Sequence, residues 1–354
     1  MSVRDRAYGA VGAWFDRVAV RAALDLAARG RPQAPSSRDA WRLKQLDDVA
    51  ETYGALSREL GPGGFFRAPP EPGITAHPVR PLGASGSALD LVWDSGYAPR
   101  HPGYRAEHEA VPENLTACAR WLRHEGAPAP ALVCVHGYLG GPFGFEERAF
   151  SARWLYERGL DVVLFQLPYH GRRCPPGRAG MFPGKDPWRT VEGLSQALWD
   201  LGGLCAHLRA RGAPSVGLFG MSLGGYTVSL AATALEGLSY VVPMIPLASL
   251  ADVYFEHREG RPESPPSWVR PRLERAFEAV SPLHRPPMVA PERVLVLAAE
   301  GDRITRTDHA LRLQAHFSCA LATFPGGHLL QFGRDRAFGA LCRFLAGHGV
   351  IAPR

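Results

Sequence analysis

From Ala131 onward, short apolar runs alternate with longer amphipathic stretches, and this alternation constrains the fold more than any other feature of the sequence. The predicted strands lie at 131–137, 161–171, 215–222, 240–249, 293–302 and 319–328. The predicted helices lie at 145–159, 188–212, 223–237, 307–317 and 334–349. Strands that are apolar along their whole length are typical of a parallel sheet covered on both faces. We therefore predict an α/β fold in which helices cover both faces of a mostly parallel, twisted sheet.

Two helices are predicted at the N-terminus. Residues 3–30 carry apolar side chains close to helical spacing, with Arg and Asp between them. Residues 37–60 predict a second helix, capped by Ser36 or Ser37. Two interpretations of the first helix stay open: it packs on the main domain, or it makes a peripheral contact with a membrane surface.

A stretch rich in Pro and Gly, residues 61–73, separates these helices from the rest. We accordingly divide the chain into an N-terminal helical extension with its linker, 1–70, and a main domain, 71–354. The main domain is expected to open with two strands, at 74–83 and 88–97, joined by a turn.

One segment of the main domain interrupts the alternation. Residues 250–292 are charged, Pro-rich and partly helical, and they stand between two predicted strands. Ligands of open α/β sheets bind at the carboxyl ends of the strands, where such an insertion would lie. We interpret it as a lid; the alternative is a solvated excursion.

Ser222 is the candidate nucleophile. It lies between Gly220 and Gly224, at the point where a predicted strand turns into a predicted helix. This strand–turn–helix context is typical of a nucleophile elbow, in which glycines permit a turn too tight for side chains. The competing interpretation is an ordinary serine that caps a helix.

An elbow serine needs a base and an acid, which follow it along the chain in the order acid, then histidine. Asp302 stands at the carboxyl end of a predicted strand, with Glu300 as its competitor two residues earlier. His328 follows the last predicted strand. His309 and His316 fall within a predicted helix and are interpreted as surface residues.

An acyl-transfer site also needs donors for a developing oxyanion. The backbone N–H of Leu223, directly after the serine, is one candidate. The second is the N–H of Tyr138, in the loop that follows the strand 131–137. His136, which precedes this turn, is interpreted as a structural hydrogen-bonding residue.

The segments HGYLGG (136–141), GMSLGG (220–225), EGDRIT (300–305) and GGHLL (326–330) together resemble the α/β-hydrolase superfamily, over about residues 75–350. The resemblance implies Ser222 as nucleophile, Asp302 as acid, His328 as base and the N–H groups of Tyr138 and Leu223 as oxyanion donors. The segment LPYHGRR (167–173) is similar to a little-characterised branch of α/β-hydrolase-domain proteins.

This resemblance implies hydrolysis of a carboxylic ester, including lipid esters and thioesters, through an acyl-enzyme intermediate. Acyl transfer to another alcohol on the same triad is one alternative, and a catalytically silent binding protein is another. A small-molecule or lipid ester is the expected partner. Neither a cofactor nor a metal is implied.

Arginines suggest an anionic substrate. Arg172 and Arg173 follow a predicted strand at the same sheet edge as Ser222, where a guanidinium can bind a carboxylate or phosphate. The predicted lid adds Arg261, Arg270, Arg272 and Arg275. The alternative is that Arg172 or Arg173 bridges to a carboxylate of the lid, such as Glu274.

The composition argues against other function classes. The net charge is +6, but only Lys44 and Lys185 are lysines, and no basic cluster is interleaved with aromatic residues. Nucleic-acid binding is therefore not expected. The six cysteines lack metal-binding spacing, and no apolar stretch is long enough to cross a membrane. These features favour a cytoplasmic protein without structural disulfides.

Overall fold

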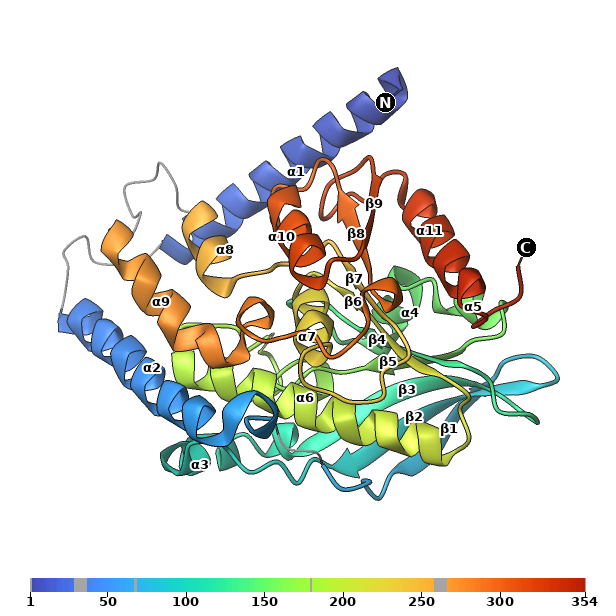
Figure 1. Ribbon diagram of the computed structural model, residues 1–354, viewed down its shortest axis with the longest axis horizontal. Coiled ribbons are helices and arrows are strands. Elements are labelled where there is room, and N and C mark those ends of the chain that lie inside the picture. The colour runs from blue at the N-terminus through green and yellow to red at the C-terminus, as the bar shows by residue number, and fades with distance from the viewer. Residues whose placement is uncertain (1, 29–36, 67–68, 179, 258–265, 354) are drawn as a thin grey trace.

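The computed structural model describes residues 2–28, 37–66, 69–178, 180–257 and 266–353. Its centre is a nine-stranded sheet in the order β1-β2-β3-β5-β4-β6-β7-β8-β9 (Figure 1). The strands are β1 (Thr75–Pro81), β2 (Gly86–Asp94), β3 (Thr116–His124), β4 (Ala131–Val135), β5 (Asp161–Phe165), β6 (Val216–Met221), β7 (Val241–Met244), β8 (Leu295–Ala299) and β9 (Ala320–Phe324). The strands from β4 to β9 pair in parallel, whereas β1, β2 and β3 add antiparallel pairs at one edge.

Helices cover both faces of this sheet, as predicted (Figure 1). The helices are α1 (Val3–Ala28), α2 (Ser37–Gly64), α3 (Arg105–Glu109), α4 (Phe143–Ala149), α5 (Ala152–Tyr156), α6 (Pro187–Ala210), α7 (Leu223–Ala231), α8 (Leu250–Glu256), α9 (Arg270–Phe277), α10 (Thr307–Phe317) and α11 (Arg334–Gly347). One apolar core lies between the sheet and helices α6, α7 and α10. A second core, on the opposite face, involves α4, α5 and α11.

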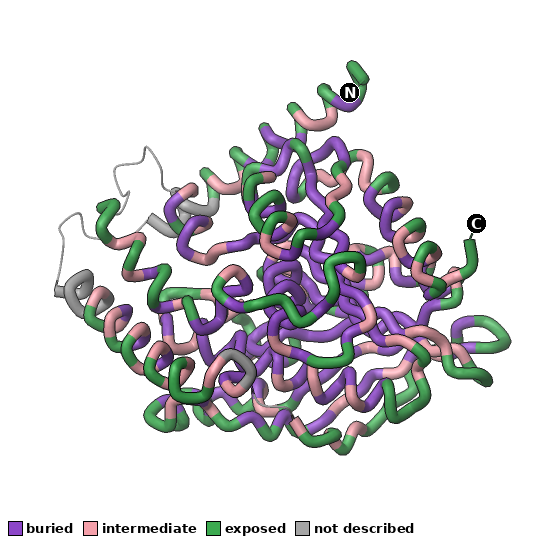
Figure 2. Tube along the Cα trace, viewed as in Figure 1, coloured by how far each residue is buried: buried purple, intermediate pink, exposed green. Residues whose placement is uncertain are grey.

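The apolar runs of the sequence form the buried strands. Every residue of β4, β5, β6, β7 and β8 is buried, which Figure 2 shows as the purple centre of the molecule. The edge strand β1 is exposed along its whole length. It contains Pro78 and Pro81, which lack the N–H needed to extend the sheet and so protect this edge.

A strand and a helix of the main domain show how the structure differs from the prediction. Strand β3 was not predicted, because arginines interrupt its apolar pattern. The single helix predicted over 145–159 is instead the pair α4 and α5, separated by Ser151 with φ of 50°. The chain turns there while Phe150 remains buried against Phe219, at 5.3 Å between ring centroids.

The N-terminal helices pack on the main domain. The Tyr53 hydroxyl of α2 donates a 2.5 Å hydrogen bond to Glu192, a buried carboxylate of α6. Asp47 of α2 accepts a hydrogen bond from Arg272 of α9, and Figure 1 shows α2 and α9 side by side. Among the helices that the structure describes, none is long and apolar enough to cross a membrane.

Helix α9 belongs to the insertion predicted as a lid. The centre of this insertion, 258–265 with Arg261, lies outside the described residues. In the described part, Leu273 and Ala276 are buried in the core beneath α2. This part is therefore packed against the protein, and its role as a lid stays a prediction.

Candidate active site

Ser222 occupies a tight turn between β6 and α7. Its φ of 56° and ψ of −116° are unusual for a residue with a side chain and project its hydroxyl from the turn. A Cβ at Gly220 would lie 2.1 Å from the Gly224 carbonyl oxygen, and a Cβ at Gly224 would lie 1.9 Å from the Val135 carbonyl oxygen. Both flanking positions therefore need glycine.

Three predicted side chains meet at this turn. His328 Nε2 lies 2.9 Å from Ser222 Oγ, and His328 Nδ1 lies 2.8 Å from Asp302 Oδ2. Because a carboxylate only accepts, Nδ1 carries the proton and leaves the Nε2 lone pair for the serine O–H. The imidazole is thus oriented as a base toward Ser222.

Asp302 is held by the loop after β8. Its Oδ1 accepts hydrogen bonds from the N–H groups of Ile304 and Thr305, each at 2.8 Å. The Thr305 hydroxyl lies 3.0 Å from Oδ2 and 3.1 Å from His328 Nδ1. Glu300 is exposed and accepts a hydrogen bond from Thr323, so the geometry favours Asp302 as the acid.

The protonation of His328 depends on its surroundings. Burial alone lowers the pKa of the imidazole, because a charged ring is poorly solvated there. The charge and hydrogen bond of Asp302, together with the charge of Asp16, raise this pKa by more, so the net shift is upward. A raised pKa makes His328 a stronger proton acceptor from Ser222.

The predicted oxyanion donors lie beside Ser222. Leu223 is the first residue of α7, so its N–H has no acceptor within the helix. A Cβ at Gly137 would lie 3.3 Å from Ser222 Cβ, which places the loop of Tyr138 against the serine. This arrangement fits the predicted oxyanion site, although the Tyr138 donor stays a prediction.

His136 holds this loop in place, as interpreted from the sequence. Its Nδ1 donates to the Gly137 carbonyl at 2.8 Å, and its Nε2 accepts from the Leu167 N–H at 3.0 Å. Burial and the nearby His170 lower the pKa of His136 to about 3. The ring is therefore neutral and serves as a structural link between the loops after β4 and β5.

No protein-family model matches the chain. Two Mycobacterium tuberculosis proteins, Rv2627c and MT2702, both described as uncharacterized, are each 34% identical to it over 288 residues, which is 78% of this chain and 68% of the relative.

Solved structures share the fold. Acetyl xylan esterase from Paenibacillus sp. R4 superposes with a TM-score of 0.57 and 15% identity, over 85% of this chain and 94% of the esterase. Acetyl xylan esterase 1 from Thermoanaerobacterium sp. JW/SL YS485 gives a TM-score of 0.54 and 15% identity, over 85% and 93%. The chain belongs to the family that contains Rv2627c, and its fold is that of the α/β-hydrolases. Shared fold at this identity leaves the substrate open.

The two arginines after β5 both pair with carboxylates of the protein. Arg173 is fully buried; its guanidinium donates to Asp200 Oδ2 at 2.8 Å and to the Asn114 carbonyl oxygen at 3.0 Å. Arg173 therefore binds groups of the protein itself, which corrects the expectation that it binds substrate. Arg172 is half-exposed and pairs with Asp90 at 2.9 Å.

Described arginines of the insertion are engaged as well. Arg270 pairs with Asp252, and Arg272 and Arg275 both pair with Asp47. Their carboxylate partners come from α2 and α8. Arg172 and Arg173 also pair with carboxylates, but with Asp90 and Asp200 rather than with a lid carboxylate such as Glu274.

Sequence reasoning missed two residues that touch the triad. Thr305 bonds to both Asp302 and His328, and Asp16 of α1 accepts a hydrogen bond from the His328 backbone. The signal for Asp16 is its place, together with Asp5, on the face of α1 opposite to Val11 and Trp14. Recognising it from sequence would have required knowing where α1 docks.

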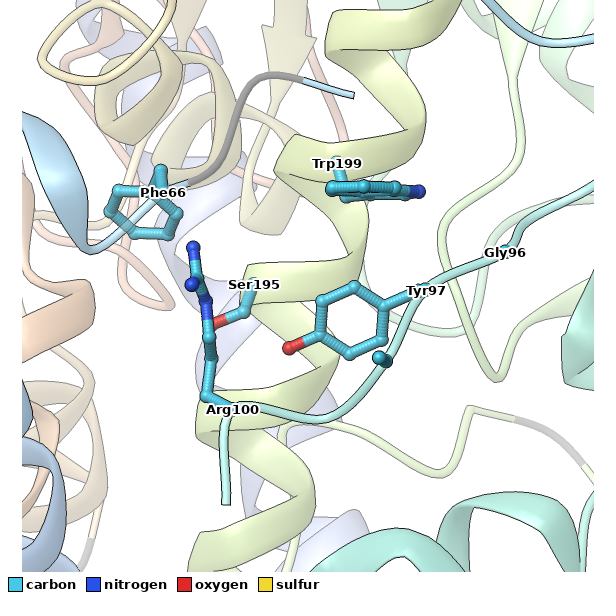
Figure 3. A pocket seen from close by; sticks show the side chains of 7 residues that line it. Phe66, Gly96, Tyr97, Arg100, Ser195 and Trp199 are labelled. Atoms are coloured by element: carbon cyan, nitrogen blue, oxygen red, sulfur yellow. The ribbon is translucent and has the colours of Figure 1, made fainter. Parts of the chain in front are cut away.

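A small cavity of about 40 Å³ lies away from the triad, between α6 and the segment after β2 (Figure 3). Tyr97, Arg100, Ser195 and Trp199 are among its lining residues, and their side chains gather around it in Figure 3. None of the triad residues lines it. Its volume is far below the roughly 300–1,000 Å³ of typical ligand pockets, so it is too small for an ester substrate.

Proposed function

We propose that this α/β-hydrolase is a serine hydrolase that cleaves carboxylic esters through an acyl-enzyme intermediate. The observation that carries the proposal is the continuous hydrogen-bonded series from Ser222 through His328 to Asp302. It begins at a half-buried serine in strained backbone geometry. A serine that only capped a helix would need neither the strain nor the imidazole.

In the first half of the reaction, Ser222 Oγ attacks the ester carbonyl carbon while its proton passes to His328 Nε2. Asp302 stabilises the imidazolium that forms and keeps the ring oriented. The N–H groups of Leu223 and Tyr138 take up the negative charge on the tetrahedral oxygen. His328 then protonates the departing alcohol, which leaves the acyl group on the serine.

In the second half, water replaces the alcohol. His328 removes a proton from the water, whose oxygen attacks the acyl carbon, and a second tetrahedral intermediate forms at the same donors. Its collapse releases the carboxylic acid and returns the proton to Ser222. Water and ester are consumed, and acid and alcohol are produced.

Exposed apolar side chains adjoin the residues assigned to this chemistry along the chain. Tyr138 and Leu139 belong to the loop after β4, Leu329 follows His328, and all three are exposed. Exposed apolar residues at a reaction site favour an apolar acyl or alcohol group. This supports a lipid-like or other apolar ester, and thioesters remain within the same chemistry. The esterase names of the structural neighbours support ester hydrolysis in general.

Labelling by a fluorophosphonate probe tests the proposal, because the probe reacts only with an activated serine. We expect the protein to be labelled at Ser222, the variant Ser222→Ala to be unlabelled, and p-nitrophenyl esters to be hydrolysed by the unmodified protein alone. A correctly folded protein that neither reacts with the probe nor cleaves these esters would instead be a catalytically silent binding protein.

A further inference from the structure

One carboxylate of the N-terminal helix joins the two loops that carry the acid and the base. Asp16 Oδ2 accepts hydrogen bonds from the backbone N–H groups of His328, at 2.7 Å, and of Arg303, at 3.1 Å. Asp16 Oδ1 accepts from the Leu329 N–H at 3.1 Å. Arg303 directly follows Asp302, so the fully buried Asp16 bridges the acid loop and the histidine loop.

The backbone of α1 rests directly on the same two loops. A Cβ at Gly12 would lie 2.3 Å from the Gly327 nitrogen, and a Cβ at Gly301 would lie 2.4 Å from the Gly9 carbonyl oxygen. Gly9, Gly12 and Asp16 share one helix face, since they are three and four residues apart. Glycine at both sides of this contact lets the helix come close enough for the Asp16 carboxylate to reach.

We propose that Asp16 is a positioning residue of the active site, and that α1 is part of the catalytic unit rather than an accessory extension. The hydrogen bonds of Asp16 hold His328 in line with Ser222 and fix the distance between the acid loop and the histidine loop. The proposal rests on the proposed function, because it assigns Asp16 a role in that site.

Charge adds to the geometric role. Two carboxylates act on the His328 ring, Asp302 from the loop after β8 and Asp16 from α1. Arg303 is a cation beside this group, and its Nη1 donates to the Asp302 carbonyl oxygen at 3.2 Å. Removal of the Asp16 charge removes one of the causes that raise the pKa of His328, so the pKa should fall.

The variant Asp16→Asn tests the role through two measurements. One is the rate of fluorophosphonate labelling as a function of pH; the other is the pKa of the His328 ring by NMR, which needs no catalysis. We expect labelling to slow by about 10- to 100-fold, as for a small misplacement of a catalytic group. The inflection of the labelling rate and that of the NMR titration should both move to lower pH. Asp16→Glu should restore the inflection better than Asp16→Asn.

Two pairs of variants on α1 supply matched controls. Asp5 anchors the same helix through Arg336, at 2.8 Å, without touching the histidine loop. Asp5→Asn should therefore leave the pH inflection unchanged. Gly12→Ala should reproduce the slow labelling, whereas Gly9→Ala, whose Cβ would meet no atom within 4 Å, should not.

The outcomes separate the two proposals. Equal pH inflections in Asp16→Asn, Asp5→Asn and the unmodified protein would overturn the positioning role and leave α1 as a structural support. An NMR shift of the His328 pKa without any labelling of the unmodified protein would keep the contact and refute the hydrolase. If Asp16→Asn does not fold, the comparison of Gly12→Ala with Gly9→Ala decides whether the contact of α1 positions His328.

The opposite face of α1 carries a second, independent inference. We define this outer face by five exposed apolar residues, with exposures from 38% to 77%: Val3, Val11, Trp14, Phe15 and Val18. Arg4, Arg6 and Arg17 are exposed on the same helix, whereas Asp5 and Asp16 are turned into the protein. The outer face therefore combines apolar and positive groups, and Figure 1 shows α1 along the outside of the molecule.

We infer that the outer face of α1 binds an anionic lipid surface. An apolar stripe with arginines beside it is the pattern by which surface helices bind membranes. A second copy of the chain would bring the same arginines against one another, so charge favours lipid over self-association. Trp14, which is 60% exposed, is the residue expected to enter the lipid headgroup region.

Co-sedimentation with vesicles tests this inference. We expect binding to phosphatidylglycerol vesicles, little binding to phosphatidylcholine vesicles, and several-fold weaker binding for Trp14→Ala and Arg17→Glu. Trp268→Ala is the control, because Trp268 is similarly exposed but lies near α9. Absence of binding to phosphatidylglycerol would overturn the inference. A dimer that Trp14→Ala converts to a monomer would assign the outer face to a second copy.

Discussion

Arg173 and Asp200 form an ion pair, 2.8 Å between nitrogen and oxygen, from which solvent is fully excluded. The pair connects the loop after β5 to helix α6. Burial raises the pKa of Asp200, and the Arg173 charge opposes that shift. The attraction between the two charges thus offsets the cost of burying each of them.

Arg173→Ala should destabilise the protein strongly, because it leaves the Asp200 carboxylate buried without its partner. We expect a loss of about 3–5 kcal/mol in the free energy of unfolding, measured by urea denaturation. Arg172→Ala is the matched control. Arg172 is exposed and Asp90 keeps Arg120 as a partner, so the loss should be only about 0–1 kcal/mol. Equal losses in the two variants would contradict this assignment.

Ser222→Ala should abolish ester hydrolysis while the melting temperature changes little. The Ser222 hydroxyl bonds only to His328 among the described side chains, so its removal sacrifices few packing contacts. Loss of a triad member typically reduces the rate by several orders of magnitude. Rates with a p-nitrophenyl ester and thermal melting together check this; appreciable turnover by the variant would assign the nucleophile elsewhere.

Asp302→Asn should slow acylation by about 10⁴-fold, because an amide neither stabilises the imidazolium nor enforces the right tautomer. Glu300→Gln should have little effect, since Glu300 is exposed and contacts Thr323 rather than His328. The two variants are compared by the rate of acyl-enzyme formation. The reverse order of effects would make Glu300 the acid.

The reaction rate should rise with pH as His328 loses its proton. Burial lowers the pKa of His328, but Asp302 and Asp16 raise it by more, so the inflection should lie above the ordinary histidine value of about 6.5. Asp302 raises the pKa of His328 by more than Asp16 does, so Asp302→Asn should move the inflection to lower pH. A pH profile of kcat/KM for the unmodified protein is the measurement; an inflection below 6.5 would contradict the shift.

Local patterns predicted the parts of the fold that local interactions determine. The buried strands and the Ser222 turn carry their own signal in apolar runs and glycines. Strand β3 was missed because Arg120 interrupts it, and its guanidinium is accommodated by Asp90 directly across the sheet, at 2.8 Å. No property of β3 alone reveals this cross-strand partner.

The candidate site was likewise predictable from sequence only in part. The triad residues follow strand ends, so their meeting at one sheet edge was predictable from the order of elements. His309, predicted as a surface residue, is fully buried and accepts a hydrogen bond from the Ala248 N–H at 3.0 Å. That interpretation was wrong, as was the role expected for Arg173, because in both cases a partner distant in sequence determines burial.

The hydrogen bond between Asp16 and His328 joins positions 312 residues apart. A ribosome releases α1 before the acid loop and the histidine loop, so the helix can contact them only when β9 and His328 have emerged. Contacts of such long sequence separation form late, because the intervening chain must first be ordered. A nascent chain would therefore carry Ser222 without an aligned imidazole until the loop of His328 has been synthesised.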